Sequence, residues 1–172
     1  MRVCFHGAES TGKSSLAEKL AAEWECPLVA EYGRTYAETI DINFRLADLT
    51  AIAAMQNRMM REACAANPPL VLLDTDPLMT AAWAEMLFGQ APSVLFGYDK
   101  AELYLLFEPD VPFVPDGTRF FGRDEERQRF AALAEDMLVR CGMDFVRISG
   151  AWEEREARVR EAIASAMQGA PA

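Results

Sequence analysis

The sequence lacks several features that mark common classes of protein. Its 172 residues include one histidine and four scattered cysteines without a C-x-x-C pair, which disfavours a zinc site and suits reduced thiols. No apolar run is long enough for a membrane span, and the first predicted strand begins at Met1, so we expect no signal peptide. We therefore expect a cytoplasmic protein without a membrane partner.

Positive charge is also scarce. The 17 Lys and Arg residues stand against 27 Asp and Glu residues, which gives a net charge of −10. Such a surface repels nucleic acid, and no aromatic and basic residues interleave as they do in a nucleic-acid groove. A guanine-reading Asn/Thr-Lys-x-Asp motif is missing too, which disfavours a GTPase switch. We therefore expect a small-molecule partner, with the oligomeric state left open.

What the sequence does contain is a complete phosphate-loop (Walker A) motif, G-x-x-x-x-G-K-[ST], at positions 7–14. It lies between a predicted strand and a predicted helix, so its backbone N–H groups and the helix dipole point at one anion. Lys13 is expected to reach the β- and γ-phosphates of ATP, and the Ser14 hydroxyl to bind Mg²⁺. The predicted ATP contacts are Gly7, Glu9, Ser10, Thr11, Gly12, Lys13, Ser14 and Ser15.

Short apolar runs alternate with helical patterns along the chain, which is typical of a parallel α/β sheet. Strands are predicted at 1–6, 27–30, 70–73, 103–107 and 144–148, and helices at 14–24, 45–64, 78–88, 124–140 and around 152–163. Residues 108–122 carry Pro, Asp and Gly without periodicity and predict a lid. We expect a P-loop NTPase domain over 1–168, a three-layer α/β/α sandwich with a five-stranded parallel sheet, and a flexible tail at 169–172.

Acidic side chains follow the second and third predicted strands, at the edge where parallel sheets bind ligands. Asp74 comes directly after four apolar residues and is predicted to hold Mg²⁺ together with Ser14. Asp76 precedes Pro77 and fits a helix N-cap better than a ligand, although a substrate contact is also considered. Glu31 and Asp74 are the two candidates for the base that takes the acceptor's proton.

Arginines supply the candidates for charge neutralisation. Arg34 lies one helical turn after Glu31, so it clamps a substrate or the γ-phosphate, or simply pairs with Glu31. The neighbouring Tyr32 either stacks on a ring or packs. The lid carries three further arginines, of which we expect at least one to act on the transferred phosphoryl group, against ordinary ion pairs with the acidic residues at 124–126. They are Arg119, Arg123 and Arg127.

These segments together resemble the kinase domain of the NadR-like proteins, a group of AAA-28-like NTPases. The resemblance runs from residue 1 to about 163 and includes the Glu9-Ser10 pair in the phosphate loop, Glu31-Tyr32-Gly33-Arg34, Asp48 and Gln56, residues 73–76, residues 110–119 and the Glu154-Arg155 pair. The resemblance implies a nucleoside-kinase-like enzyme that uses ATP and Mg²⁺ to phosphorylate the ribose 5′-hydroxyl of nicotinamide riboside in NAD biosynthesis.

The resemblance also adds Gln56 to the expected substrate-binding residues, which are then Glu31, Tyr32, Arg34, Gln56 and Asp76. Some relatives place an aromatic residue just before the Glu-Tyr-Gly-Arg segment, where this chain has Ala30. Tyr32, Trp83 or Phe113 could take the place of that ring. The alternatives are a kinase for another nucleoside, nucleotide or small metabolite, and a nucleotide-binding regulatory module without metabolic turnover.

Overall fold

The computed structural model describes residues 1–40, 43–114 and 121–169. Its centre is a five-stranded sheet in the order β2-β3-β1-β4-β5, and every neighbouring pair is parallel. The strands are β1 (Arg2–Gly7), β2 (Leu28–Val29), β3 (Val71–Leu73), β4 (Leu103–Phe107) and β5 (Phe145–Ile148). The predicted five-stranded parallel sheet is therefore confirmed.

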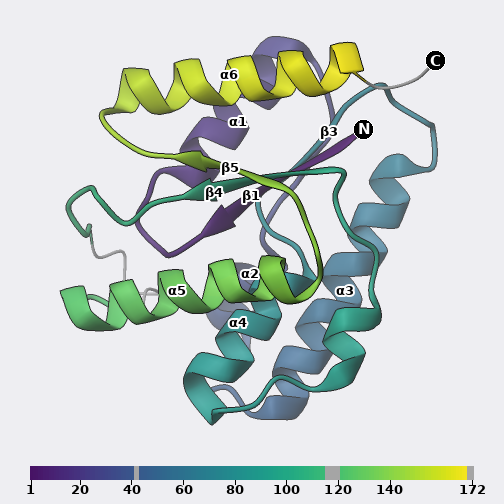
Figure 1. The fold of residues 1–172 in the computed structure, drawn as a ribbon. Helices are drawn as coiled ribbons and strands as arrows, with labels where there is room; N and C mark the ends of the chain where they lie inside the picture. The colour runs from purple at the N-terminus through teal and green to yellow at the C-terminus, as the bar shows by residue number, and fades with distance from the viewer. Residues whose placement is uncertain (41–42, 115–120, 170–172) are drawn as a thin grey trace.

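Helices cover both faces of this sheet (Figure 1). One face carries α1 (Lys13–Trp24) and α6 (Trp152–Gly169). The other carries α2 (Tyr32–Thr39), α3 (Leu46–Cys64), α4 (Pro77–Phe88) and α5 (Asp124–Arg140), with a short 3-10 helix, η1 (Ser93–Gly97), before β4. This is the predicted three-layer sandwich, to which the structure adds the helices α2 and η1.

The two layers of core follow from the alternation of side chains along the buried strands. In β1, Val3 and Phe5 pack with the helices α1 and α6, while Cys4 between them packs with α3, α4 and α5. In β4, Leu105 and Tyr104 divide between the two faces in the same way. A parallel strand covered on both faces needs apolar residues at every position, which explains the unbroken runs in the sequence.

Different residues lie at the two ends of the strands. The carboxyl ends of β1, β2 and β3 lead into the phosphate loop, Glu31 and Asp74. At the opposite end, the Trp24 ring lies under the Arg160 guanidinium, 5.4 Å from ring centroid to charge. Within the described residues, no helix combines the length and the apolar character needed to cross a membrane. Arg119 and residues 170–172 of the predicted tail lie outside the described part of the chain.

Candidate functional site

The phosphate loop adopts the backbone that its glycines permit. Gly7 has φ 125° and a Cβ there would lie 2.5 Å from the Phe107 carbonyl oxygen. Gly12, with φ 85°, occupies the N-cap position of α1 and offers no side chain to the first N–H groups of the helix. The N-terminus of α1 thus presents its backbone N–H groups to an anion, as the sequence predicts.

The loop is braced from inside by its own side chains. The Lys13 Nζ donates to the Ala8 carbonyl at 2.5 Å and to the Thr11 Oγ1 at 3.3 Å. Thr11 Oγ1 in turn donates to the same Ala8 carbonyl at 2.9 Å. The Lys13 ammonium therefore lies over the loop and donates to neutral oxygens. A bound phosphate would accept a stronger, charge-assisted hydrogen bond from it.

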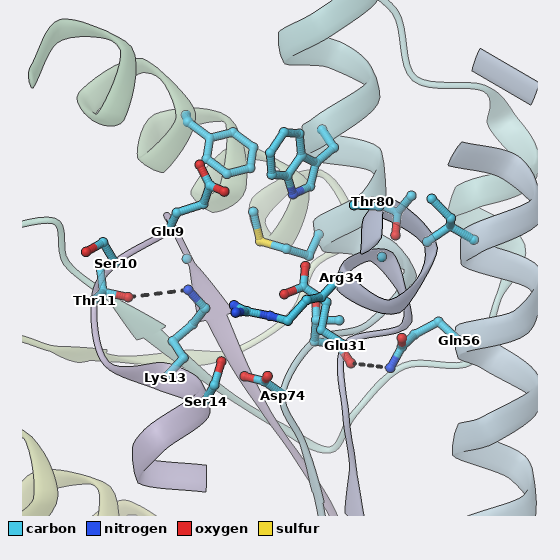
Figure 2. Close-up of a pocket in the computed structure, with 18 of the residues that line it drawn as sticks. Glu9, Ser10, Thr11, Lys13, Ser14, Glu31, Arg34, Gln56, Asp74 and Thr80 are labelled. Carbon is cyan, nitrogen blue, oxygen red and sulfur yellow. Dashed lines mark hydrogen bonds between the residues drawn. The ribbon is translucent and has the colours of Figure 1, made fainter. Parts of the chain in front are cut away.

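One pocket extends from this loop to the second and third strand ends and to α3, α4 and α5 (Figure 2). The phosphate loop forms one end. The other end is formed by a largely apolar wall, to which Phe44, Ile52, Met79, Trp83 and Phe130 contribute. Between the two ends lie Glu31, Arg34 and Asp74. Every predicted phosphate-loop contact, from Gly7 and Glu9 to Ser15, lines this pocket.

Asp74 lies where a metal ion next to the phosphate loop needs a carboxylate. It accepts a hydrogen bond from Ser14, and burial raises its pKa while Lys13, Ser14 and Arg34 act to lower it. Its Oδ1 is buried and has no hydrogen-bond partner among the described residues. An uncompensated carboxylate oxygen beside a hydroxyl is the donor set that Mg²⁺ prefers, so Ser14 and Asp74 fit the predicted ion.

Glu31 has the most unusual environment of the pocket carboxylates. Desolvation raises its pKa to about 7, the nearby Asp74 charge adds to the rise, and Lys13 and Arg34 oppose it. A carboxylate whose pKa is close to neutral exchanges its proton readily at physiological pH. Figure 2 shows Arg34 extending from the Glu31 side of the pocket toward Lys13, so its guanidinium lies near the phosphate loop.

Gln56 lines the pocket, but its amide is used to hold the pocket wall together. Its Oε1 accepts from the Tyr32 backbone N–H at 2.8 Å, and its Nε2 donates to the carbonyls of Ala30 and Thr75 at 3.1 and 3.3 Å. These bonds join the ends of β2 and β3 to the start of α2. Tyr32 does not appear in the described lining; its ring packs edge-on against Tyr36, with centroids 6.4 Å apart.

Asp76 is a correction to the expected substrate contacts. Its side chain is fully buried, caps α4 by accepting from the N–H groups of Leu78 and Met79, and accepts the Tyr104 hydroxyl at 2.5 Å. It is absent from the described pocket lining. The N-cap alternative is therefore the one that the structure supports, because both carboxylate oxygens already have donors.

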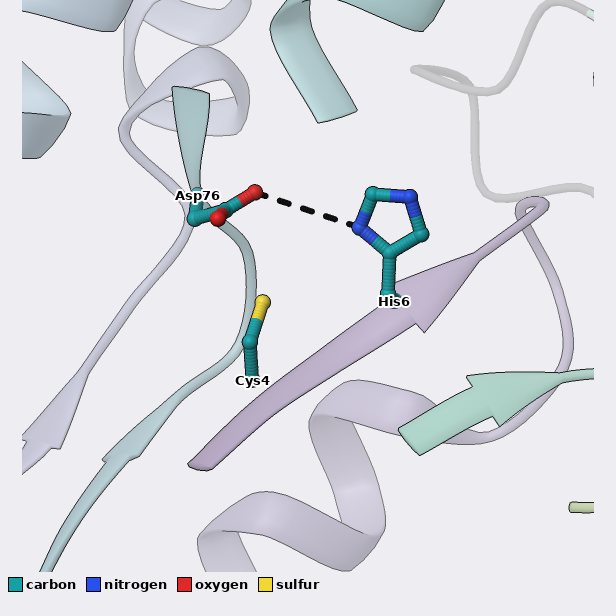
Figure 3. A group of neighbouring side chains, drawn as sticks. All are labelled: Cys4, His6 and Asp76. Carbon is teal, nitrogen blue, oxygen red and sulfur yellow. Dashed lines mark ion pairs between the residues drawn. The ribbon is translucent and has the colours of Figure 1, made fainter. Parts of the chain in front are cut away.

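Asp76 forms a buried group with Cys4 and His6 (Figure 3). Their ligand-type atoms lie within 4.8 Å of one another, and His6 Nδ1 is 3.9 Å from Asp76 Oδ1. The other ring nitrogen of His6 bonds the Ala134 carbonyl at 2.9 Å, so His6 joins β1 to α5. These partners make His6 a packed and hydrogen-bonded residue.

The structure describes two of the three lid arginines, Arg123 and Arg127. Arg127 is 4% exposed, donates to the Val111 carbonyl at 3.0 Å and lies 5.7 Å from the Phe113 ring centroid. Arg123 is exposed at the N-cap position of α5. Neither belongs to the described pocket lining, which corrects the expected phosphate contacts in this arrangement of the chain. Arg119 lies outside the described residues.

The aromatic wall of the pocket is a feature that the sequence pattern did not single out. Trp83 of α4 and Phe130 of α5 have ring centroids 4.9 Å apart, and Phe121 lies 5.0 Å from each of them. Trp83 is one of the residues proposed to replace the missing ring at Ala30. The helix α4 is buried on nearly all sides, so no apolar stripe marked Trp83 as facing a pocket.

Two of the four variable residues in the phosphate loop hold the segments that flank residues 115–120. Ser10 Oγ accepts from the Val114 N–H at 2.7 Å, and Glu9 Oε2 accepts from the Phe121 N–H at 3.2 Å. Glu9 also lines the pocket next to the aromatic wall. The Glu9-Ser10 pair therefore ties the phosphate loop to the predicted lid at two points, one before and one after residues 115–120.

Comparison with known proteins agrees with this geometry. Residues 2–155 match the AAA_28 family model, described as an AAA domain. The chain is 31% identical over 153 residues to the trifunctional NAD biosynthesis/regulator protein NadR of Escherichia coli, covering 85% of this chain and 37% of that protein. It thus spans little more than a third of this curated relative.

Among solved structures, a NadR protein in complex with NR superposes with a TM-score of 0.81 at 22% identity, over 99% of this chain and 52% of that one. Thymidylate kinase from Ehrlichia chaffeensis superposes with a TM-score of 0.68 at 13% identity, over 96% of this chain and 97% of that one. The predicted resemblance and fold class are confirmed: the chain belongs to the AAA_28 family of P-loop domains and is related to the NadR proteins.

Proposed function

We propose that the chain is an ATP-dependent phosphotransferase that phosphorylates the ribose 5′-hydroxyl of nicotinamide riboside. The observation that carries this proposal is one continuous pocket with a phosphate loop at one end, an aromatic wall at the other and two carboxylates between them. That arrangement suits a triphosphate and a ring-bearing acceptor meeting in line. The similarity to NadR proteins, one of them solved with NR, supports the choice of acceptor.

The phosphate end of the pocket has the groups that a triphosphate requires. The N–H groups at the start of α1 and the Lys13 ammonium bind the phosphate oxygens. Ser14 and Asp74 would hold Mg²⁺, which neutralises charge on the β- and γ-phosphates when bound. These groups align ATP and stabilise the charge that develops during transfer, so the rate gain comes from position and electrostatics.

Glu31 is the better placed of the two candidate bases. Asp74 is engaged by Ser14, whereas Glu31 lies between the phosphate loop and the aromatic wall with a pKa raised to about 7. In this proposal the acceptor hydroxyl oxygen bonds to the γ-phosphorus, the β–γ bridging bond breaks, and ADP leaves. Glu31 takes the hydroxyl proton, which keeps the step balanced.

The aromatic wall and the acidic side chains suit a cationic ring. The nicotinamide ring of the riboside carries a permanent positive charge, which is attracted to the face of an aromatic side chain such as Trp83. Glu9 and Glu31 line the same pocket and complement that charge. A neutral nucleoside of similar size loses this attraction, so the pocket favours nicotinamide riboside over uncharged nucleosides.

The test is an acceptor panel with ATP and Mg²⁺, read by mass spectrometry of the phosphorylated product. Nicotinamide riboside is compared with nicotinic acid riboside, adenosine, thymidine and uridine, with Glu31→Gln as the catalytic variant. We expect nicotinamide mononucleotide as the main product and loss of turnover, with retained ATP binding, in E31Q. Turnover of a different acceptor alone would show that the acceptor is wrong, and ATP binding without any acceptor-dependent turnover would favour a regulatory module.

A further inference from the structure

Arg155, in the first turn of α6, is the bulkiest of the fully buried side chains in the described part of the chain, at 1% exposure. Burial lowers the pKa of its guanidinium, and the Glu108 charge opposes this effect. Burying a charged group is unfavourable unless each of its polar atoms finds a partner. The buried position of Arg155 therefore indicates that its hydrogen bonds have a role that an apolar side chain cannot fill.

The guanidinium joins three parts of the chain that are distant in sequence. Its Nη1 donates to the Thr11 carbonyl at 3.3 Å, and its Nε donates to the Gly150 carbonyl at 2.8 Å. Its Nη2 donates to the Glu108 carbonyl at 3.1 Å and pairs with the Asp110 carboxylate. All three nitrogens donate hydrogen bonds, so one side chain links the phosphate loop, the end of β4 and the turn before α6.

These segments are the phosphate loop itself and two segments that adjoin it. Thr11 precedes Gly12, whose N-cap position sets the first N–H groups of α1. The Trp152 ring lies 2.8 Å from where a Gly12 Cβ would be, so the start of α6 covers the loop from outside. Glu108 and Asp110 begin the segment that leads to Val114, and Asp110 also accepts from the Gly150 N–H at 2.8 Å.

We propose that Arg155 is a positioning residue for the phosphate loop: it fixes the Thr11 carbonyl, and with it the N–H groups that bind the triphosphate, against the β5–α6 turn and the end of β4. Arg155 lies outside the described lining of the pocket, so it acts through Thr11 rather than on the ligand. The inference rests on the proposed ATP site but not on the identity of the acceptor.

An arginine is needed at this position because the three contacts diverge. The planar guanidinium offers donors in fixed directions, whereas a lysine ammonium has a different shape and reaches fewer of these acceptors. Arg155→Lys keeps the positive charge but removes the planar set of donors that reaches the three acceptors. We expect it to weaken ATP binding about tenfold, the effect of losing one good hydrogen bond to a charged group, and to leave the acceptor's KM within about twofold.

The experiment measures the Kd of a non-hydrolysable ATP analogue by calorimetry, and KM for ATP and for acceptor separately. Arg158→Lys is the matched control, since Arg158 lies one turn further along α6, is exposed and donates to the Arg147 carbonyl. Asp110→Asn tests the same network without changing Arg155, and a smaller loss of ATP affinity is expected. The unfolding temperature of each variant confirms that it is folded in the assay.

The proposal is overturned if R155K binds the analogue as tightly as the wild type, or if ATP and acceptor affinities fall by the same factor. Should R155K fail to fold, D110N decides by the same comparison with R158K. A wild-type chain that does not bind the analogue would refute the proposed function as well. If the wild type and R155K both bind the analogue and turn over substrate equally well, only the role of Arg155 is refuted.

Discussion

Replacing Glu31 by glutamine is expected to make the protein more stable while abolishing its activity. The reason is the raised pKa: Glu31 titrates near 7 in the folded protein and near 4.5, the ordinary value, when unfolded. Between pH 4.5 and about pH 7, Glu31 is therefore protonated more often in the folded state than in the unfolded state. Ionising Glu31 above pH 7 thus destabilises the fold, and this destabilisation disappears below the unfolded pKa.

The size of the effect follows from the shift. A shift of 2.5 pKa units, from 4.5 to about 7, corresponds to an upper limit of about 3 kcal/mol at pH 8 and less than about 1 kcal/mol at pH 5. Glutamine is neutral at both pH values, so E31Q should gain most of this difference at pH 8. For a chain of this length the gain corresponds to an increase of very roughly 5 to 10 °C in Tm.

Urea unfolding of wild type and E31Q at pH 8 and pH 5 measures this prediction directly. Glu62→Gln is the control, because Glu62 is an exposed residue of α3 paired with Arg58 on the surface. The reasoning is wrong if E31Q is no more stable than the wild type at pH 8, or if its gain is the same at both pH values. Such a result would mean that Glu31 is not desolvated in the folded chain.

Three other substitutions test separate parts of the site. Gly12→Ala should abolish binding of the ATP analogue, because the new Cβ meets the Trp152 ring at 2.8 Å on a backbone with φ 85°, and calorimetry checks this. Trp83→Ala should raise the acceptor's KM tenfold or more and leave the Kd for ATP unchanged; equal losses would place Trp83 in the fold rather than the acceptor wall. Tyr104→Phe removes the hydroxyl that donates to Asp76, so the free energy of unfolding should fall by about 1 to 2 kcal/mol. Both KM values should stay unchanged, and a shift in either would contradict the structural role of Asp76.

The elements that the sequence predicted best are those with clear signals at both ends. Residues 103–107 form β4 within the predicted bounds, because a run of five apolar residues is followed at once by Glu108. The helix α5 begins at the predicted Asp124, where three acidic residues complement the helix dipole. In contrast, η1 carries neither periodicity nor a cap, and its place depends on packing against α3 and α4 rather than on local sequence.

The site residues also divide into those that the local sequence places and those that depend on contacts with distant segments. The phosphate loop is encoded by consecutive residues, so its motif places all its members. Gln56, Trp83 and Arg127 depend on contacts with residues far along the chain, such as Ala30, Phe121 and Val111. For Asp76, capping and ligand binding use the same carboxylate before the same proline. In the structure its two oxygens are occupied by the N–H groups of Leu78 and Met79 and by the Tyr104 hydroxyl.

The three tryptophans of the chain occupy three different environments. Trp152 touches the phosphate loop at Gly12, Trp83 lines the far wall of the pocket, and Trp24 lies under Arg160 at the opposite end of the molecule. Their fluorescence therefore reports separately on the two halves of the pocket, with Trp24 as an internal reference. Fluorescence titrations of the Trp83→Phe and Trp152→Phe variants with nucleotide or acceptor then assign each signal change to one half of the pocket without any label.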